Sequence, residues 1–292
     1  MKIFPKKIAI IGVGLIGGSI ALGLKKHFGS KINIFGLCRS AKRGKKAVES
    51  GIIDKAISDV KSIPSDIDLI IIATPISEIL EILNRIARIP LKSYLVFDVG
   101  STKKIITDAA AKILPKNALF IGTHPMAGSE MSGFENADPN LFRNKPWIVC
   151  SALPTTNRQL STIKNLIDAL GAKFILMNAK MHDGLTVWAS HIFLAVSSIL
   201  IGLITKKEAV KEIAKIASTG FRDTTRLASD NPKMKTDIFL TNKDNVINSL
   251  DCLIEEINYF KELLIRENER EVLHYLMNSK LQRDNWLAQY FS

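Results

Sequence analysis

Two short segments hold the residues whose types and spacing suggest chemistry. The segment Thr123–Glu130 places a histidine, His124, and a carboxylate, Glu130, in one turn that contains both proline and glycine. Far upstream, the glycines of Gly12–Gly17 have the G-x-G-x-x-G spacing of loops that bind a dinucleotide. A histidine held on a rigid loop in such a fold can accept the proton of a substrate hydroxyl during hydride transfer. The sequence therefore predicts a nicotinamide-dependent oxidoreductase.

The glycine loop lies in the context that its function requires. It follows the apolar run Ile8–Ile11, which predicts a strand, and it precedes a helix predicted over Ser19–Lys26. The first glycine permits a tight turn, the second lets the pyrophosphate approach the backbone, and the third lets helix and strand pack closely. We expect five residues to bind the cofactor here: Gly12, Gly14, Leu15, Ile16 and Gly17.

The end of the second predicted strand, Ile32–Leu37, indicates which cofactor binds. NAD-binding folds usually carry Asp or Glu there, to accept a hydrogen bond from the ribose 2′-hydroxyl. This chain has Arg39 and Ser40 instead, followed by four more Lys or Arg residues up to position 46. A guanidinium beside a hydroxyl suits a 2′-phosphate, so we expect NADP in preference to NAD. The alternative is that Arg39 is a solvated surface cation and that NAD is used.

Further ligand contacts are expected after the predicted strands Leu69–Ala73 and Leu95–Val99, because ligands bind at the carboxyl ends of strands in such sheets. Ser101 could hydrogen-bond the substrate or the nicotinamide. It could equally cap the helix predicted over Lys103–Leu114, and the two roles are compatible. Three neighbouring residues are expected to bind the cofactor: Thr74, Pro75 and Gly100.

His124 is the candidate catalytic residue. It follows the predicted strand Leu119–Ile121 and precedes Pro125, whose ring restricts the backbone of the residue before it. This position at a strand's carboxyl end favours a catalytic histidine over a structural one. Ser129 is a candidate substrate contact, while Glu130 could orient or gate the site or simply face solvent.

A second polar cluster, Ser218–Arg226, lies between predicted helices far from the sheet in sequence. Its two arginines, Arg222 and Arg226, are four residues apart and share a helix face. One can pair with Asp223 while the other forks a substrate carboxylate. We expect Arg226 to bind the substrate, with Thr219 beside it, although an entirely structural Arg–Asp network remains the alternative.

The elements that must position these residues change in type along the chain. Short, nearly continuous apolar runs alternate with helical periods in the first part, and nine of the ten prolines fall at or before Pro154. This alternation predicts an α/β fold of the Rossmann type, with a doubly wound and mostly parallel sheet. After about Asn178 only helical periods remain. We therefore predict a dinucleotide-binding domain over residues 1–178 and an all-α substrate and dimerisation domain over residues 179–292.

Composition narrows the function class. The net charge of +12 can attract an anionic cofactor and substrate, but no aromatic-basic pattern accompanies it, so no nucleic-acid partner is expected. The three cysteines lie far apart, which predicts no metal site and fits a reducing cytoplasm. The apolar stretch Leu185–Thr205 is long enough to span a bilayer but carries His191 and several serines. We interpret it as a helix buried at the centre of a helical domain or of a dimer, and we expect no membrane association.

These motifs together resemble the prephenate/arogenate dehydrogenase family of tyrosine biosynthesis. The matching segments run in family order from Ile8 to about Glu269 and read GVGLIGGSIAL, DVGSTK, GTHPMAGSE, HD, SH, GFRDTTR and DIFLTNK. The resemblance implies an N-terminal Rossmann domain and a helical domain that forms a homodimer, with the site in the cleft between the two domains. It implies His124 as the catalytic histidine, assisted by Ser101, with Arg226 on a substrate carboxylate and His191 facing the site.

The resemblance further implies oxidative decarboxylation of prephenate, with arogenate as the alternative substrate. Two departures bear on that choice: Leu194 stands where the family often has a second histidine, and Lys235 stands where many members have tryptophan. A 3-hydroxyacid dehydrogenase or pyrroline-carboxylate reductase type of enzyme is a further alternative. A redox-sensing regulator that binds NADP without turnover is the non-enzymatic one.

Overall fold

The computed structural model describes residues 4–128, 131–150 and 157–290. By internal contacts the chain divides into two compact units, Met1–Lys243 and Asp244–Ser292. The predicted domain boundary after residue 178 lies inside the first of these units, and it stays a prediction. Each unit is described by itself.

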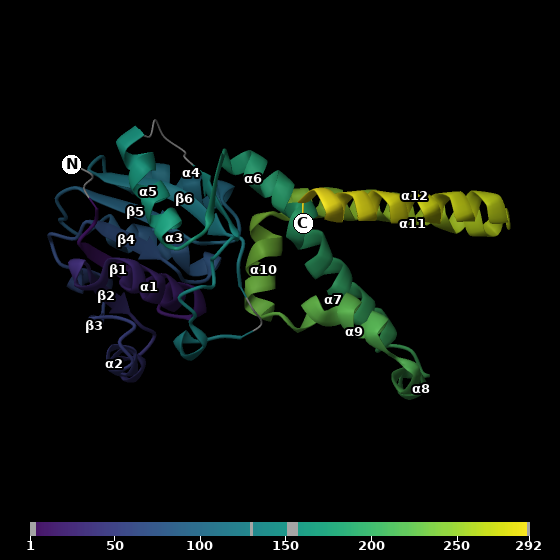
Figure 1. Cartoon of the computed structure of the whole chain (residues 1–292), viewed down its shortest axis with the longest axis horizontal. Helices are drawn as coiled ribbons and strands as arrows, with labels where there is room; N and C mark the ends of the chain where they lie inside the picture. Colours follow the sequence, from purple (N-terminus) through teal and green to yellow (C-terminus); the bar gives the residue numbers. More distant parts are fainter. Residues whose placement is uncertain (1–3, 129–130, 151–156, 291–292) are drawn as a thin grey trace. The chain divides into compact units, whose positions relative to one another are not determined.

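The first unit is built on one eight-stranded sheet with the order β3-β2-β1-β4-β5-β6-β7-β8 (Figure 1). All neighbouring strands pair in parallel except β6 and β7, which are antiparallel. The sequence gives no signal for β3, because this three-residue strand has two exposed positions and hence no apolar run to mark it. The strands are β1 (Lys7–Ile11), β2 (Asn33–Leu37), β3 (Lys55–Ile57), β4 (Leu69–Ile72), β5 (Tyr94–Asp98), β6 (Ala118–Pro125), β7 (Pro146–Cys150) and β8 (Lys173–Met177).

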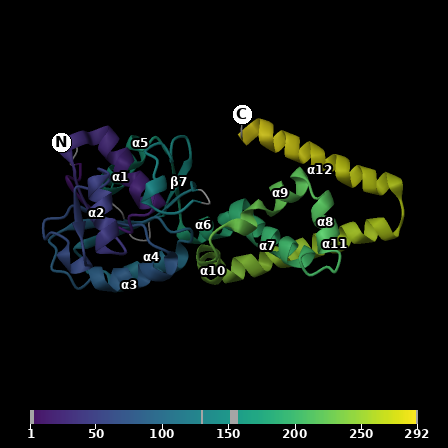
Figure 2. The ribbon, with the colours of Figure 1, turned by 90° about the horizontal axis from the view of Figure 1, so that it is seen from below.

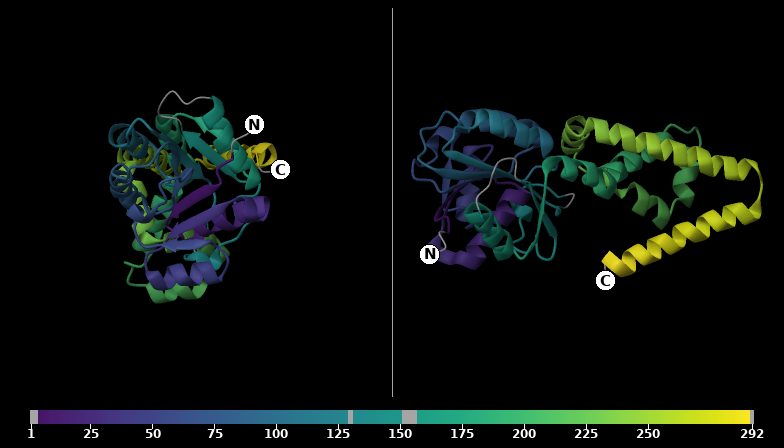
Figure 3. Two further views of the ribbon diagram at one scale, coloured as in Figure 1. Left: turned by 90° about the vertical axis from the view of Figure 1, so that its left-hand side faces the viewer. Right: turned by 90° about the horizontal axis from the view of Figure 1, so that it is seen from above.

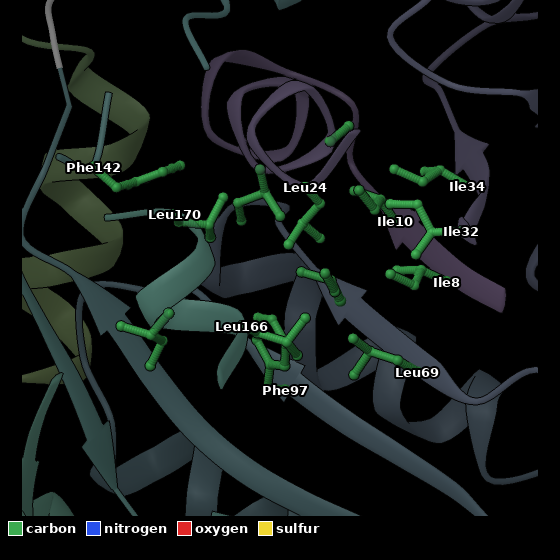
Figure 4. Close-up of a cluster of buried hydrophobic side chains, with 14 of the residues drawn as sticks. Ile8, Ile10, Leu24, Ile32, Ile34, Leu69, Phe97, Phe142, Leu166 and Leu170 are labelled. Atoms are coloured by element: carbon green, nitrogen blue, oxygen red, sulfur yellow. The ribbon is translucent and has the colours of Figure 1, made fainter. Parts of the chain in front are cut away.

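Helices cover both faces of the sheet, as the doubly wound prediction requires. Figure 2 shows α3 and α4 on the side opposite to α1 and α5. One apolar cluster joins α1 and α5 to the first face, and Figure 4 shows Leu24 of α1 and Leu166 of α5 in it, together with Leu170, which directly follows α5. A second cluster joins α3 and α4 to the other face. These helices are α1 (Leu15–Phe28), α2 (Ala41–Glu49), α3 (Ile76–Ile86), α4 (Lys104–Ile113) and α5 (Asn157–Ala169).

The rest of the first unit is helical, which confirms that strands end after β8 in the described part of the chain. A continuous helical stretch, Ala179–Ile204, is long and apolar enough to cross a membrane by length and composition alone, and 33% of its most apolar window is buried. The expectation of a buried helix is therefore met only in part within the single chain. The segments are α6 (Ala179–Thr186), a π-helical turn (Val187–His191), α7 (Ile192–Ile204), α8 (Val210–Ile216), α9 (Thr219–Thr225), the 3₁₀ turn Arg226–Ser229 and α10 (Pro232–Thr241).

The second unit consists of two long helices, α11 (Lys243–Ile265) and α12 (Glu269–Tyr290), that run back from a short turn in opposite directions (Figure 3). Large apolar side chains stand exposed along both helices, among them Ile257 and Trp286, with exposed fractions of 56% and 60%. A stable surface of a single chain does not normally present so much apolar area.

Candidate active site

The glycine loop forms the turn that dinucleotide binding needs. Gly12 has a φ of +96°, and a Cβ there would lie 2.5 Å from the carbonyl oxygen of Ala73. A Cβ on Gly17 would lie 2.3 Å from the carbonyl oxygen of Gly12, so the helix can approach the strand only with glycine present. Gly14, by contrast, faces open space, with no atom within 4 Å of such a Cβ. The first and third glycines thus serve packing, and the second leaves room for a ligand.

A cleft of about 690 Å³ opens beside this loop. The hydroxyl oxygen of Thr74 is buried there without a hydrogen-bond partner in the described structure. An unpaired buried hydroxyl is costly, so a ligand with a polar group at this place would be favoured. The residues present therefore fit a nicotinamide dinucleotide. Five of the predicted cofactor-binding residues line the cleft: Gly12, Gly14, Arg39, Thr74 and Pro75.

Three further predicted cofactor residues are not among the described residues that line this cleft: Leu15, Ile16 and Gly100. Leu15 and Ile16 form the first turn of α1 and are partly exposed. Gly100 is buried, and its N–H donates to the carboxylate of Asp98 at 2.8 Å. Gly100 therefore supports the turn after β5.

The end of β2 presents cations to the cleft. Arg39 is exposed and forms no ion pair with the described residues. Arg43 also lines the cleft, but its guanidinium is engaged by Glu135 at 3.1 Å and lies over the ring of Phe134. Ser40 caps α2, because its hydroxyl oxygen accepts from the backbone N–H of Arg43 at 3.3 Å. The Ser40 hydroxyl proton is still available to donate to a ligand.

His124 lies within a strand, which corrects the expectation that it follows one. Antiparallel pairing with β7, in which His124 is opposite Ile148, extends β6 through Pro125. The sequence run Leu119–Ile121 underestimated the strand because Gly122, Thr123 and His124 are not typical of a buried apolar strand. His124 is buried, with 8% of its surface exposed.

A second histidine, His182 of the HD segment, contacts His124, a contact that the sequence had not predicted. Nδ1 of His124 lies 2.9 Å from Nε2 of His182, a fully buried residue of α6. Nδ1 of His182 in turn lies 2.7 Å from a carboxylate oxygen of Asp183. The two rings and the carboxylate thus form one continuous chain of hydrogen bonds inside the protein.

Asp183 also caps α4 from a different helix. Its two carboxylate oxygens accept the backbone N–H groups of Lys103 and Lys104, at 2.7 and 2.9 Å. These groups occupy the start of α4, where backbone donors have no partner within the helix. Ser101 is therefore not the cap of this helix, which corrects that alternative: α4 begins at Lys104, with Lys103 at the N-cap position. Ser101 is partly exposed, two residues before this contact.

A buried ion pair supports the backbone next to His124. The ammonium of Lys103 contacts the carboxylate of Asp98, and both side chains are fully buried. The same ammonium donates to the carbonyl oxygen of Thr123 at 2.8 Å. The Thr123 hydroxyl donates to the Asp98 carbonyl at 2.6 Å. These contacts join the ends of β5 and β6 and hold the residue before His124 in place.

Burial sets the charge states of the site. It lowers the pKa of His124 well below its ordinary value, and the neighbouring His182, Lys103 and His191 add to this effect. His124 is therefore neutral at neutral pH. Burial opposes ionisation of Asp183, but hydrogen bonds from His182 and from the N–H groups of Lys104 and Lys103 outweigh it and lower its pKa.

His191 joins the same network through an asparagine. The side-chain amide of Asn242 donates to the carbonyl oxygen of Asp183 at 2.9 Å and lies 3.1 Å from Nδ1 of His191. His191 is 1% exposed, and burial chiefly lowers its pKa to about 4. The neutral ring can therefore accept from Asn242.

The predicted substrate-binding residues of the second polar cluster form no described hydrogen bond with this network. Thr219 and Arg226 are exposed, and no described hydrogen bond joins them to His124 or His182. Arg222 pairs with Asp223, with Nε and Oδ1 3.6 Å apart, as one of the two expected arrangements. The predicted residues Ser129 and Glu130 fall outside the described residues.

The two departures from the family pattern have definite positions. Leu194 is buried and packs in the apolar cluster with α3 and α4. Lys235 is also buried, and its ammonium donates to the Ala228 carbonyl at 2.8 Å and lies 3.2 Å from the Ser198 hydroxyl. Leu194 thus supplies packing, and Lys235 ties α10 to α7 and to the 3₁₀ turn.

Comparison with known proteins decides the family. Residues 20–176 match the family described as prephenate dehydrogenase, nucleotide-binding domain, and residues 178–279 match prephenate dehydrogenase, dimerization domain. This chain belongs to the prephenate dehydrogenase family. It is an NAD(P)-dependent dehydrogenase, and the resemblance seen in its motifs is confirmed.

Individual relatives agree with this assignment. The prephenate dehydrogenase of Bacillus subtilis is 36% identical over 279 residues, which span 95% of this chain and 75% of that protein. The structure of the A. aeolicus prephenate dehydrogenase with hydroxyphenyl propionate and NAD+ superposes with a TM-score of 0.90 at 31% identity, covering 98% of this chain and 99% of that one. Synechocystis arogenate dehydrogenase gives 0.82 at 30% identity, covering 96% and 99%.

Proposed function

We propose that this enzyme oxidises prephenate and releases carbon dioxide, forming 4-hydroxyphenylpyruvate. The observation that carries the proposal is the buried, neutral His124 at the carboxyl-terminal end of β6, in the unit that also holds the dinucleotide cleft. Arogenate, which has an amino group in place of the side-chain ketone, is the alternative substrate.

The reaction needs one base and one positioned carboxylate. Prephenate is a cyclohexadienol with a hydroxyl on C4 and a carboxylate on C1. A bound nicotinamide supplies the acceptor for the hydride that leaves C4. The hydroxyl proton passes to a ring nitrogen of His124 while the C4–O bond becomes a carbonyl. The electron pair of the C1–carboxylate bond then enters the ring, carbon dioxide leaves, and the carbonyl oxygen takes back the proton from His124 as the ring becomes a phenol.

The remaining substrate contacts belong to the same proposal. Arg226 would bind a substrate carboxylate through two parallel hydrogen bonds and so fix the substrate ring relative to the cofactor. Ser101 would assist His124 at the hydroxyl. The other proposed contacts with substrate are Thr219, Ser129, Glu130 and His191.

We further propose that NADP is preferred to NAD. Support comes from Arg39, which lines the cleft without an ion pair among the described residues, and from the Ser40 hydroxyl beside it. A double variant, Cys38→Asp with Arg39→Ala, should shift the preference toward NAD, because a carboxylate repels the 2′-phosphate and accepts from the 2′-hydroxyl. A clear NAD preference in the unaltered enzyme would contradict this proposal.

A homodimer through the helical part is also proposed. The match to a dimerization domain and the exposed apolar side chains of α7, α11 and α12 support it. Light scattering coupled to gel filtration would give the mass in solution. The expectations of a cytoplasmic location, no membrane association and no nucleic-acid partner remain predictions.

One experiment tests the central proposal. Steady-state rates are measured by the absorbance of the reduced nicotinamide, with prephenate and arogenate each combined with NADP and NAD. We expect prephenate with NADP to give the highest kcat/KM. A higher value with arogenate would replace the proposed substrate, and no turnover of either would refute the proposed function.

A further inference from the structure

The hydrogen-bond chain His124–His182–Asp183 has a direction that the carboxylate imposes. Asp183 is nearly fully buried, and its oxygens already accept two backbone N–H groups at the start of α4. An ionised carboxylate can only accept hydrogen bonds. Nδ1 of His182, 2.7 Å from Asp183, must therefore carry a proton.

The protonation of the second ring follows from that of the first. A neutral imidazole with its proton on Nδ1 has a lone pair on Nε2. In this neutral form Nε2 of His182 accepts, and the atom that donates to it across 2.9 Å is Nδ1 of His124. Neutral His124 then has its only lone pair on Nε2.

We infer that His182 and Asp183 are positioning residues that hold His124 in the tautomer able to accept the substrate proton. Without them, the proton of neutral His124 could reside on Nε2, and the ring would offer no base at that atom. The inference rests on the proposed function for its kinetic consequence but not for the tautomer itself.

The same chain can stabilise the charge that His124 acquires. Once Nε2 takes a proton, His124 is a buried imidazolium, which its environment otherwise disfavours. Its Nδ1–H continues to donate to His182, and His182 continues to donate to the Asp183 carboxylate. The negative charge is therefore joined to the imidazolium by two hydrogen bonds, and no proton transfer to Asp183 is required.

The tautomers can be read directly in the enzyme without substrate. The protein has five histidines, so ¹⁵N-histidine labelling gives a small set of ring signals. Signals are assigned with His124→Asn and His182→Asn. We expect protonated Nδ1 and unprotonated Nε2 for both His124 and His182 at neutral pH. Protonated Nε2 on either ring overturns the inference, whatever the enzyme's substrate proves to be.

A kinetic comparison tests the positioning role. In His182→Asn the amide can still donate to Asp183 but does not extend to His124. We expect kcat to fall on the order of 10²-fold, with the KM values little changed, because a fraction of His124 adopts the wrong tautomer. The ¹⁵N signals of His124 should show that change.

The matched control is Thr186→Val on the same helix. The buried Thr186 hydroxyl donates to the main-chain carbonyl of His182 at 2.9 Å, and valine has nearly the same shape. This variant should keep kcat within about threefold and leave the His124 tautomer unchanged. Equal losses in both variants, or a His182→Asn enzyme with nearly normal kcat, would show that His182 is only structural.

Discussion

Two regions are proposed to contact opposite ends of the substrate. They differ in how far their side chains are buried and hydrogen-bonded within the chain. Around His124, every group in the chain to Asp183 is buried and hydrogen-bonded. In the segment of α8 and α9, by contrast, Ile216 is 82% exposed, and the side chains of Arg222 and Asp223 are 75% and 72% exposed.

This difference separates proton transfer from carboxylate binding. A proton acceptor must have a defined tautomer and pKa, which requires fixed neighbours and exclusion of water. An exposed arginine such as Arg226 gains little binding energy from a carboxylate until substrate, nicotinamide or a second copy of the chain covers it. The groups of the buried region have their hydrogen-bond partners within one unit. The groups of the exposed region would need a bound ligand or a second chain to be covered.

The largest expected effect is in the buried region. His124→Ala and His124→Asn should lower kcat by roughly 10²–10⁴-fold, the usual contribution of a general base. Cofactor affinity should stay nearly unchanged, because His124 does not line the dinucleotide cleft as described. Stopped-flow or steady-state rates together with cofactor titration would measure both. Turnover within a few-fold of the unaltered enzyme would rule out the assigned role.

Arg226 tests whether the exposed region becomes covered during turnover. If bound substrate covers Arg226, the variant Arg226→Ala should lose about 2–5 kcal/mol of substrate-binding free energy. The loss should appear mainly as a higher KM for substrate. Arg226→Lys should restore little, because lysine lacks the planar fork that pairs with a carboxylate. The KM for the cofactor serves as the internal control. A change in substrate KM below about fivefold would mean that Arg226 stays solvated.

The sequence predicted the parts of the site that lie in local motifs. The fold class, the glycine loop and the cofactor cleft residues follow from contiguous patterns, because each strand–turn–helix unit forms locally. It did not predict that His124 contacts His182, since the two are 58 positions apart and meet through the packing of α6 against α4 and β7. An adjacent His-Asp pair at the start of a helix was the available signal. The sequence also did not predict that Asp183 caps α4, because Ser101 is the candidate nearer to this helix along the chain.

The buried histidines also predict how stability depends on pH. His191 has a pKa of about 4 in the folded protein, below the ordinary value of 6.5. The unfolded chain therefore binds a proton that the folded one excludes, and stability is lost as the pH falls from about 6.5 toward 4. The full difference between the two pKa values corresponds to a loss of about 3 kcal/mol in the free energy of unfolding.

Urea unfolding at fixed protein concentration, at several pH values between 7 and 4, would measure this loss. In His191→Gln, which cannot titrate, the loss over this range should be smaller by up to that amount. Some loss will remain, because the pKa of His124 is lowered as well and its burial has the same sign of effect. Identical pH slopes in the two proteins would contradict the assignment to His191.

The smallest expected effect distinguishes the two arginines of the exposed region. The sequence alone suggested that Arg222 is the structural partner of Asp223. The structure places that pair at 3.6 Å with both side chains largely in solvent, where ion pairs contribute about 0–1 kcal/mol. Arg222→Ala should therefore change the free energy of unfolding by less than about 1 kcal/mol and leave the substrate KM within about threefold, while Arg226→Ala raises it. Urea unfolding and steady-state kinetics on both variants give the comparison. A large loss of stability in Arg222→Ala would show that a second copy of the chain buries this pair, and equal kinetic defects in both variants would show that the two arginines share the carboxylate.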